Sequence, residues 1–252
     1  MIAVQFLTTI PIPGNPVRED KDLGRSMLFY PIVGLLIGAI TAALYRLVSH
    51  LFTPAVSLTI VYVAAIVLTG GLHIEGFADM CDGFYAGKDK AGILSIMKDS
   101  HIGTMAVLGV FCLLLLKISL LFSLLLKDAL IPAFLLVPAI SRWIMAVAAA
   151  FYPYARAEGG TARPFIEHAG GVEVLLSSFF ILSISYFILN ASGVLISLAT
   201  LAIAGIFMIW VKRKIGGVTG DILGGLNEIS EVSALLLFNI VFGIHKTGAF
   251  LS

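Results

Sequence analysis

The chain has 252 residues, of which 59% are hydrophobic and 12% charged, and its mean hydropathy is +1.04. Soluble domains average about 45–50% apolar and about 25% charged residues, so this composition excludes an ordinary water-soluble protein and indicates an integral membrane protein. Sixteen basic residues against fifteen acidic ones give a net charge of +1, which excludes nucleic-acid binding through a broad basic surface.

Seven apolar stretches are candidates for membrane-spanning segments. A helix needs about 20 apolar residues to cross a bilayer core of about 30 Å, and the last stretch is shorter than the other six. Their apolar character is continuous and lacks the period-2 alternation of barrel strands, which favours helices. We expect one domain over residues 1–252, an all-α polytopic transmembrane helix bundle with about six or seven spans. The expected spans are 29–48, 54–70, 105–126, 129–151, 174–189, 194–211 and 232–244, with a hairpin turn at 190–193.

The distribution of charge predicts the orientation in the membrane. With these spans, eleven of the sixteen Lys and Arg residues lie on the side of the N-terminus and three on the other side, while Lys117 and Arg142 fall inside spans. The side richer in Lys and Arg is normally cytoplasmic. Fourteen of the fifteen acidic residues lie on the same side. We therefore expect a protein of the cell (inner) membrane whose polar loops face the cytoplasm.

The two basic residues inside spans have different interpretations. Lys117 reads as a residue that extends to the interface or sits between helices, whereas Arg142 needs an anionic partner inside the bundle. A transport pathway would require ionisable groups in several spans, and these two alone qualify. The charge pattern therefore argues against a simple ion or solute transporter.

The most informative segment is 70–87, GGLHIEGFADMCDGFYAG. Glu75, Asp79 and Asp82 follow one another at spacings of four and three residues, which places three carboxylates on one face of a helix. A divalent cation offsets the repulsion between them, and oxygen ligands select magnesium, manganese or calcium. A solvated acidic helix face is the alternative. Flanking glycines, which let the backbone approach a ligand closely, and His73 one turn earlier favour a site.

A second acidic segment, GGVTGDILGGLNEISE, covers residues 216–231. A helix that starts near Thr219, with that residue as a cap, would present Asp221, Glu228 and Glu231 on a second cytoplasmic acidic face. Two glycine-flanked acidic segments on one side of a bundle indicate a shared metal and phosphate site, and phosphoryl transfer is the natural chemistry there.

Together with the motifs at 71–83 and 217–231, the segments FLTTIPIP (6–13), IMKD (96–99) and RAEG (156–159) resemble the cobalamin synthase family, also called adenosylcobinamide-GDP ribazoletransferase. Thr9 departs from the expected pattern, where a basic residue would stand. The resemblance implies a magnesium-dependent last step of nucleotide-loop assembly. A hydroxyl of α-ribazole, or of its 5′-phosphate, attacks the phosphoryl group on adenosylcobinamide-GDP, and GMP leaves.

The resemblance also implies roles for individual residues. Mg²⁺ would be held by Glu75, Asp79, Asp82 and Asp221, and His73 or Asp82 would be the general base. Candidates for substrate contacts, of which the first three would reach phosphate oxygens, are Lys98, Arg156, Arg163, Asn227, Glu228 and Glu231.

Other functions stay open at this stage. A CDP-alcohol phosphotransferase also carries an acidic motif beside a span, but its Asp-Gly-x-x-Ala-Arg continuation is absent, because 82–87 ends in glycine. A metal or corrinoid transporter would use the acidic loops as a cation entrance. A scaffold subunit is the third alternative. Expected partners are the two substrates and the lipid bilayer, with no nucleic acid, and a second copy of the chain or other nucleotide-loop enzymes are left open.

Overall fold

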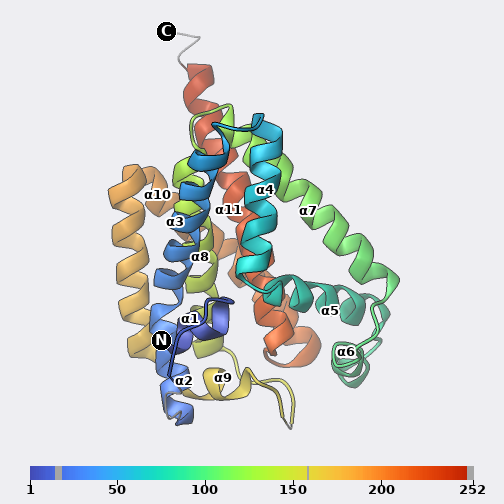
Figure 1. The fold of residues 1–252 in the computed structure, drawn as a ribbon. Helices are drawn as coiled ribbons and strands as arrows, with labels where there is room; N and C mark the ends of the chain where they lie inside the picture. Colours follow the sequence, from blue (N-terminus) through green and yellow to red (C-terminus); the bar gives the residue numbers. More distant parts are fainter. Residues whose placement is uncertain (15–18, 158, 249–252) are drawn as a thin grey trace.

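The computed structural model describes residues 1–14, 19–157 and 159–248, and of 244–248 only the backbone. Arg18, Glu158 and the Lys246 side chain, which enter the charge count or the 156–159 motif, lie outside the described part. The described elements are all helices: α1 (Ile2–Leu7), α2 (Asp20–Ser26), the 3-10 helix η1 (Met27–Phe29), α3 (Tyr30–Val48), α4 (Pro54–Leu68), α5 (Leu72–Ala86), α6 (Lys90–Ile96), α7 (Thr104–Leu125), α8 (Leu130–Phe151), α9 (Arg163–His168), α10 (Gly171–Ile215) and α11 (Gly220–Gly248) (Figure 1).

Membrane-crossing helices dominate the fold, as the composition predicts. Five helical stretches, with α10 counted once, are long and apolar enough to cross a bilayer, and the bent pair of α4 and α5 can add a sixth stretch. Each expected span coincides with one of these helices or with part of one. The expected all-α membrane bundle is therefore confirmed.

Helix α10 combines two expected spans in one continuous helical assignment of 45 residues. Leu189 and Asn190 have non-helical backbone angles, and the Ser185 and Ser197 hydroxyl oxygens lie 2.9 Å apart. Twelve residues extend about 18 Å along an unbroken helix, so this contact requires the chain to reverse. The two halves of α10 are antiparallel, so the expected hairpin is confirmed, with its break at Leu189 and Asn190, at the start of the expected turn 190–193.

Helices α3 and α8 pack closely against each other. Gly34 and Gly38 lie one turn apart on α3, and a methyl group on either would overlap a backbone carbonyl oxygen of α8, that of Pro138 or Phe134. Two small residues spaced by four let helix backbones approach closely in a membrane. This contact fixes α8, which carries Arg142, against the N-terminal third of the chain.

The chain bends by 85° between α4 and α5. The bend is located at Gly70 and Gly71, whose φ values of +62° and +69° lie in the left-handed region that glycine adopts without strain. The expected span 54–70 ends early, at Leu68. Helix α4 therefore has 15 residues and a length of about 22 Å, which is less than the thickness of a bilayer core. Thr9 closes its end by donating to the carbonyl oxygens of Val67 and Leu68, both at 3.2 Å. Helix α5 then runs across the end of the bundle (Figure 1).

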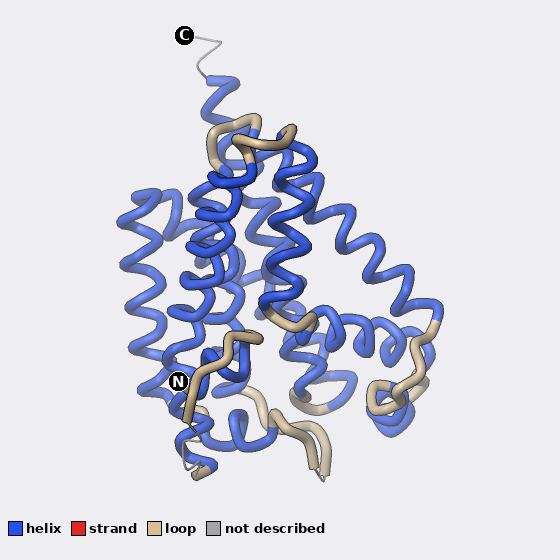
Figure 2. The backbone as a smooth tube through the Cα atoms, viewed as in Figure 1, coloured by secondary structure: helices blue, strands red, loops and turns tan. Residues whose placement is uncertain are grey.

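The polar elements gather at one end of the bundle. Helices α2, α5, α6 and α9 lie there, while the α3–α4 and α7–α8 connections and the last turns of α11 lie at the opposite end (Figures 1 and 2). We call the first the polar end. It is the end that the charge distribution assigns to the richly charged side of the membrane.

Replacing Gly34 by alanine should separate α3 from α8. The added methyl overlaps rigid backbone, so we expect the free energy of unfolding to fall by about 1–3 kcal/mol. Thermal unfolding of the detergent-purified variant measures this loss. Gly205→Ala is the matched control, because a methyl there meets nothing within 4 Å. Equal stability of the two variants would contradict the packing described here.

Candidate functional site

Helices α5 and α11 cross at a pair of glycines. A methyl group on Gly76 would lie 2.9 Å from the Asp221 carbonyl oxygen, and one on Gly224 would lie 3.2 Å from the carbonyl oxygen of His73. A side chain at Gly76 would force the backbones apart, and one at Gly224 would be tight, so the two glycines let the helices come this close. The two acidic segments, about 140 residues apart in the sequence, therefore meet at the polar end.

A cavity of about 220 Å³ opens where α5 and α11 meet. Glu75 and Asp79 of α5 and Asp221 of α11 line it, and His73 borders it. Its other wall is aromatic, with side chains from three different elements whose rings contact one another at tilted angles: Phe6, Tyr30 and Phe165. Ligand pockets typically measure about 300–1,000 Å³, so this cavity can take only part of a large substrate.

Asp221 is held at the start of α11 by two contacts. Arg156 donates to its carboxylate at 2.6 Å, and the Thr219 hydroxyl lies 3.3 Å from the same oxygen. Thr219 also accepts from the Ile222 amide at 3.2 Å and so caps α11, as the sequence predicts. A parallel bridge between Tyr154 and Val218 ties the loop that carries Arg156 to the loop before α11.

The carboxylates of this cavity repel one another. Partial burial, and then the neighbouring charges of Asp221, Glu75 and Asp82, raise the pKa of Asp79 to about 6, against which Arg156 acts only weakly. This is the electrostatic setting that a divalent cation relieves. Within the described residues, no three His, Cys, Asp or Glu side chains lie close enough together to hold an ion as they stand. Three oxygen-bearing side chains nevertheless face one cavity, so the donor chemistry fits Mg²⁺ once water or phosphate completes the ligand set.

Asp82 faces a different neighbour. Its two carboxylate oxygens accept the backbone amides of Gly103, at 2.6 Å, and Ala106, at 2.8 Å. These amides begin α7, where helix N–H groups have no partner within the helix, so Asp82 caps α7 from a distant part of the chain. It is not among the residues that line the cavity. Glu75, Asp79 and Asp82 do lie on one helix, as their spacing predicts.

Two of the basic residues expected to contact phosphate lie apart from the cavity. Arg163 is partly exposed and pairs with Glu167 one turn later at 2.8 Å. Lys98 is exposed and forms no ion pair with any residue that the structure describes. Arg156 is the one of the three that reaches a carboxylate lining the cavity.

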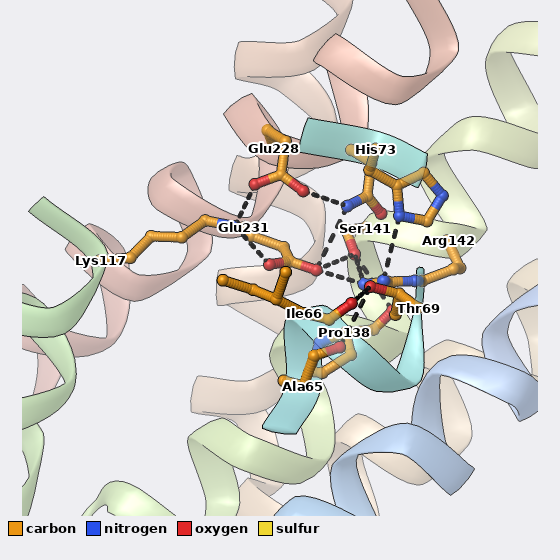
Figure 3. A network of polar contacts seen from close by, with 11 residues as sticks. Ala65, Ile66, Thr69, His73, Lys117, Pro138, Ser141, Arg142, Glu228 and Glu231 are labelled. Carbon is orange, nitrogen blue, oxygen red and sulfur yellow. Dashed lines mark hydrogen bonds and ion pairs between the residues drawn. The ribbon is translucent and has the colours of Figure 1, made fainter. Parts of the chain in front are cut away.

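The second acidic segment divides into two parts, which the sequence did not indicate. Asp221 lines the cavity, but Glu228 and Glu231 are enclosed in the bundle, where Lys117 contacts both, Glu231 at 2.6 Å. Arg142 forms an ion pair with the other oxygen of Glu231 (Figure 3). The expectation that Glu228 and Glu231 share a solvent-facing acidic surface is therefore wrong, because each has a cationic partner inside.

Asn227 belongs to the same buried group. Its amide lies 3.3 Å from Glu228 and from Glu231. Arg142 has the anionic partner that its position in a span requires, and Lys117 lies between helices, the second of its two sequence interpretations. Sequence reasoning did not connect these four charges, because Lys117 and Glu228 are 111 residues apart and no local pattern joins them.

The buried charges also change one argument made from the sequence. Ionisable groups inside the bundle are not limited to Lys117 and Arg142, so their scarcity does not speak against transport. The four charges do pair with one another, however, and leave no free ion of either sign.

Sequence reasoning likewise could not find the aromatic wall of the cavity, since Phe6, Tyr30 and Phe165 come from three separate elements.

Comparison with known proteins gives concordant matches along the whole chain. The family model described as cobalamin-5-phosphate synthase matches residues 1–239. The adenosylcobinamide-GDP ribazoletransferase of Acetivibrio thermocellus is 37% identical over 94% of this chain and 96% of its own. Proteins of the same name are 35% identical, in Clostridium kluyveri over 95% of both chains, and in Caldanaerobacter subterraneus subsp. tengcongensis over 96% of this chain and 97% of its own. No solved structure matches. The resemblance indicated by the motifs is confirmed.

The carboxylates of Asp82 and Asp79 should affect stability in opposite directions. Asp82→Asn should lower the free energy of unfolding by about 1 kcal/mol, because the amide replaces one oxygen of the α7 cap with a donor. Asp79→Asn should leave the metal-free protein at least as stable at pH 7.5. A raised pKa means that folding favours protonated Asp79, so its ionisation above pH 6 destabilises the wild type.

Thermal unfolding in detergent with a chelator measures both effects. A destabilised Asp79→Asn variant beside an unaffected Asp82→Asn variant would contradict these assignments.

Proposed function

We propose that this chain, which belongs to the cobalamin-5-phosphate synthase family, is an adenosylcobinamide-GDP ribazoletransferase. The observation that carries the proposal is the meeting of two acidic segments at one cavity on the polar end, beside an arginine. In the reaction, a ribose hydroxyl of α-ribazole or its 5′-phosphate attacks the phosphoryl group that bears the corrinoid. The bond from that phosphorus to GMP breaks, the hydroxyl loses its proton, and adenosylcobalamin or its 5′-phosphate forms.

Glu75, Asp79 and Asp221 are the residues that would hold Mg²⁺. A bound Mg²⁺ would neutralise the diphosphate and the charge that develops on departing GMP. Asp82, the fourth ligand implied by the family, supports this group from behind by joining α5 to the start of α7. Carboxylate oxygens are the protein ligands that magnesium prefers, and the ion would keep places for water and substrate phosphate.

Arg156 could pair with either of two anions during the reaction, the Asp221 carboxylate or the substrate diphosphate. It pairs with Asp221 in the structure, and its Nε is buried without a hydrogen-bond partner among the described residues. Phosphate oxygens accept from a guanidinium in the same fork geometry as a carboxylate does. We assign Arg156 to the outer oxygens of the diphosphate, because its guanidinium lies beside Asp221, one of the residues that would hold the cation. Lys98 is exposed and Arg163 partly exposed, and both would act only on substrate outside the cavity.

Asp82 and His73 were the two candidates for a general base. Asp82 is committed to the α7 cap, whereas His73 borders the cavity. A loose phosphoryl-transfer transition state needs little help from a base, because positioning and charge stabilisation dominate. The catalytic demand on this chain is therefore to hold the diphosphate and the attacking hydroxyl in line.

The polar end would face the cytoplasm of the cell membrane, since Lys and Arg concentrate on that side of the bundle. Both substrates carry charged phosphates or sugars and approach from water. The corrinoid is large, and the aromatic wall of the cavity offers it or the attached base an apolar surface. Association with a second copy or with other nucleotide-loop enzymes is compatible with this arrangement.

The decisive experiment supplies purified protein in lipid nanodiscs with adenosylcobinamide-GDP and α-ribazole, or its 5′-phosphate, and follows GMP and cobalamin together. We expect equimolar products with Mg²⁺ and none with a chelator. Asp79→Asn and Asp221→Asn should each lower kcat at least about 100-fold, since each removes charge that positions the cation. Asp89→Asn, an exposed cap of α6, is the control and should retain wild-type activity.

Equal product formation with Mg²⁺ and with the chelator would overturn the metal assignment. Absence of product from folded protein that binds Mg²⁺ would overturn the transferase proposal and favour a transporter or a partner-dependent subunit.

Magnesium affinity should fall in acid. Asp79 must lose its proton to bind a cation, and its pKa lies at about 6, so the apparent Mg²⁺ affinity should be constant above pH 7. It should fall by up to about tenfold per pH unit below pH 6. Titrations at pH 5.5, 6.5 and 7.5 measure the trend. Asp79→Asn should flatten it between pH 5.5 and 6.5, and an unchanged slope in this variant would contradict the role of Asp79.

A further inference from the structure

Burying the charged group inside the bundle costs hydration free energy. Lys117, Arg142, Glu228 and Glu231 carry two charges of each sign, and all four belong to membrane-spanning helices. Ions removed from water lose several kcal/mol of hydration each, which mutual attraction offsets only when the geometry is fixed by further hydrogen bonds. Ser141 and Asn227 supply such bonds to Glu231. Such a group adds little net stability, which suggests that its precise geometry serves another purpose.

The chain of contacts ends on His73. Lys117 donates to one carboxylate oxygen of Glu231, and Arg142 contacts the other oxygen. The second terminal nitrogen of Arg142 then lies 3.2 Å from His73 Nδ1 (Figure 3). A guanidinium can only donate hydrogen bonds. Nδ1 must therefore accept, and the single ring proton of neutral His73 is placed on Nε2.

His73 Nε2 has no partner of its own. It is fully buried and makes no hydrogen bond to any described residue. The His73 side chain is 3% exposed and lines both the cavity of Glu75, Asp79 and Asp221 and a smaller cavity of about 90 Å³ inside the bundle. A buried N–H group without a partner destabilises the fold, so its position beside a cavity points to an oxygen that arrives with a ligand.

We propose that Lys117, Glu231 and Arg142 form a positioning relay that keeps the ring proton of His73 on Nε2. His73 Nε2–H then donates a hydrogen bond to a phosphoryl oxygen of the nucleotide substrate. The inference rests on the proposed function and deepens it, because it changes the role of His73 from a base to a donor. An Nδ1 that accepts from Arg142 leaves no free lone pair on the ring. Neutral His73 in this state cannot remove a proton from the attacking hydroxyl, but it can stabilise charge on the phosphoryl group.

The relay has an order. Lys117 holds Glu231, Glu231 turns the Arg142 fork, and Arg142 sets the tautomer of the ring. These three act as positioning residues, since none of them lines the cavity that holds Asp79 and Asp221. Glu228 joins the group by accepting from Lys117 and from the Asn227 amide, while Arg142 Nε and Asn227 Oδ1 have no hydrogen-bond partner among the described residues.

Nitrogen-15 NMR of histidine-labelled protein in nanodiscs tests the tautomer without any substrate. The chain has five histidines, and the signals that disappear in His73→Gln identify His73. We expect the proton on Nε2 in the wild type. Arg142→Lys keeps a cation for Glu231 but has no second arm for Nδ1, so the Nδ1-protonated form should appear. A wild-type proton on Nδ1, or a tautomer that does not respond to Arg142→Lys, would overturn the relay.

Kinetics separate a donor from a base. The amide nitrogen of Gln can replace Nε2–H, whereas the shorter Asn reaches only the Nδ1 position. We expect kcat of His73→Gln to stay within about tenfold of wild type, and kcat of His73→Asn to fall at least about 100-fold, with KM for Mg²⁺ unchanged in both. Equal activity of the two variants, or loss of both to the same level, would contradict the donor role.

Lys127→Met provides the matched control for Lys117→Met. Lys127 also contacts α11, through the Asn239 carbonyl oxygen at 2.9 Å, but lies at the opposite end of the bundle. Lys117→Met should lower kcat about tenfold or more, and the Nδ1-protonated form of His73 should appear. Lys127→Met should change neither kcat nor the His73 tautomer. The NMR measurement needs no turnover. If the reaction assignment is wrong, the His73 tautomer should still be as proposed, without product formation. If the relay is wrong, the enzyme should be active but its His73 tautomer should differ from the one proposed.

Discussion

The close contact between Gly76 and Gly224 is the constraint on which the candidate site depends. It joins a helix that lies across the end of the bundle to a helix that enters the bundle, and it brings Asp79 and Asp221 to one cavity. The 85° bend at Gly70 and Gly71 makes this contact possible, since a straight continuation of α4 would carry α5 away from α11. Glycines at four positions thus convert two distant acidic segments into one site.

Electrostatics divides the acidic residues into two sets with different physical roles. Glu75, Asp79 and Asp221 face one cavity, and the charges of Glu75 and Asp221 repel that of Asp79, a repulsion that a cation would relieve. Glu228 and Glu231 are enclosed and already paired with Lys117 and Arg142. Breaking a buried pair typically costs about 3–5 kcal/mol, so these residues are tied to the architecture in a way that surface carboxylates are not. Asp82 joins neither set, because backbone amides of α7 satisfy its charge.

Composition and hydropathy were enough to predict the bundle, the hairpin at 190–193 and the polar end, because membrane insertion leaves few alternatives to long apolar helices. Spacing predicted that Glu75, Asp79 and Asp82 share a helix, and the glycine-rich motifs predicted the family. Partners across the bundle were beyond reach, since neither the Asp82 cap on α7 nor the pair of Lys117 with Glu228 leaves a local pattern. The bend at Gly70 was missed for a related reason: a run of apolar residues shows where a span can lie, not where glycine ends it.

The central claim is that carboxylates of α5 and α11 hold one shared cation, and a double-mutant cycle on Mg²⁺ affinity tests it most directly. The dissociation constant is measured for the wild type, Asp79→Asn, Asp221→Asn and the double variant in nanodiscs. A shared site predicts strong non-additivity, with the second substitution costing far less than the first because the cation is already lost. Additive losses in the double variant would show that the two residues act at separate sites, and would contradict the account.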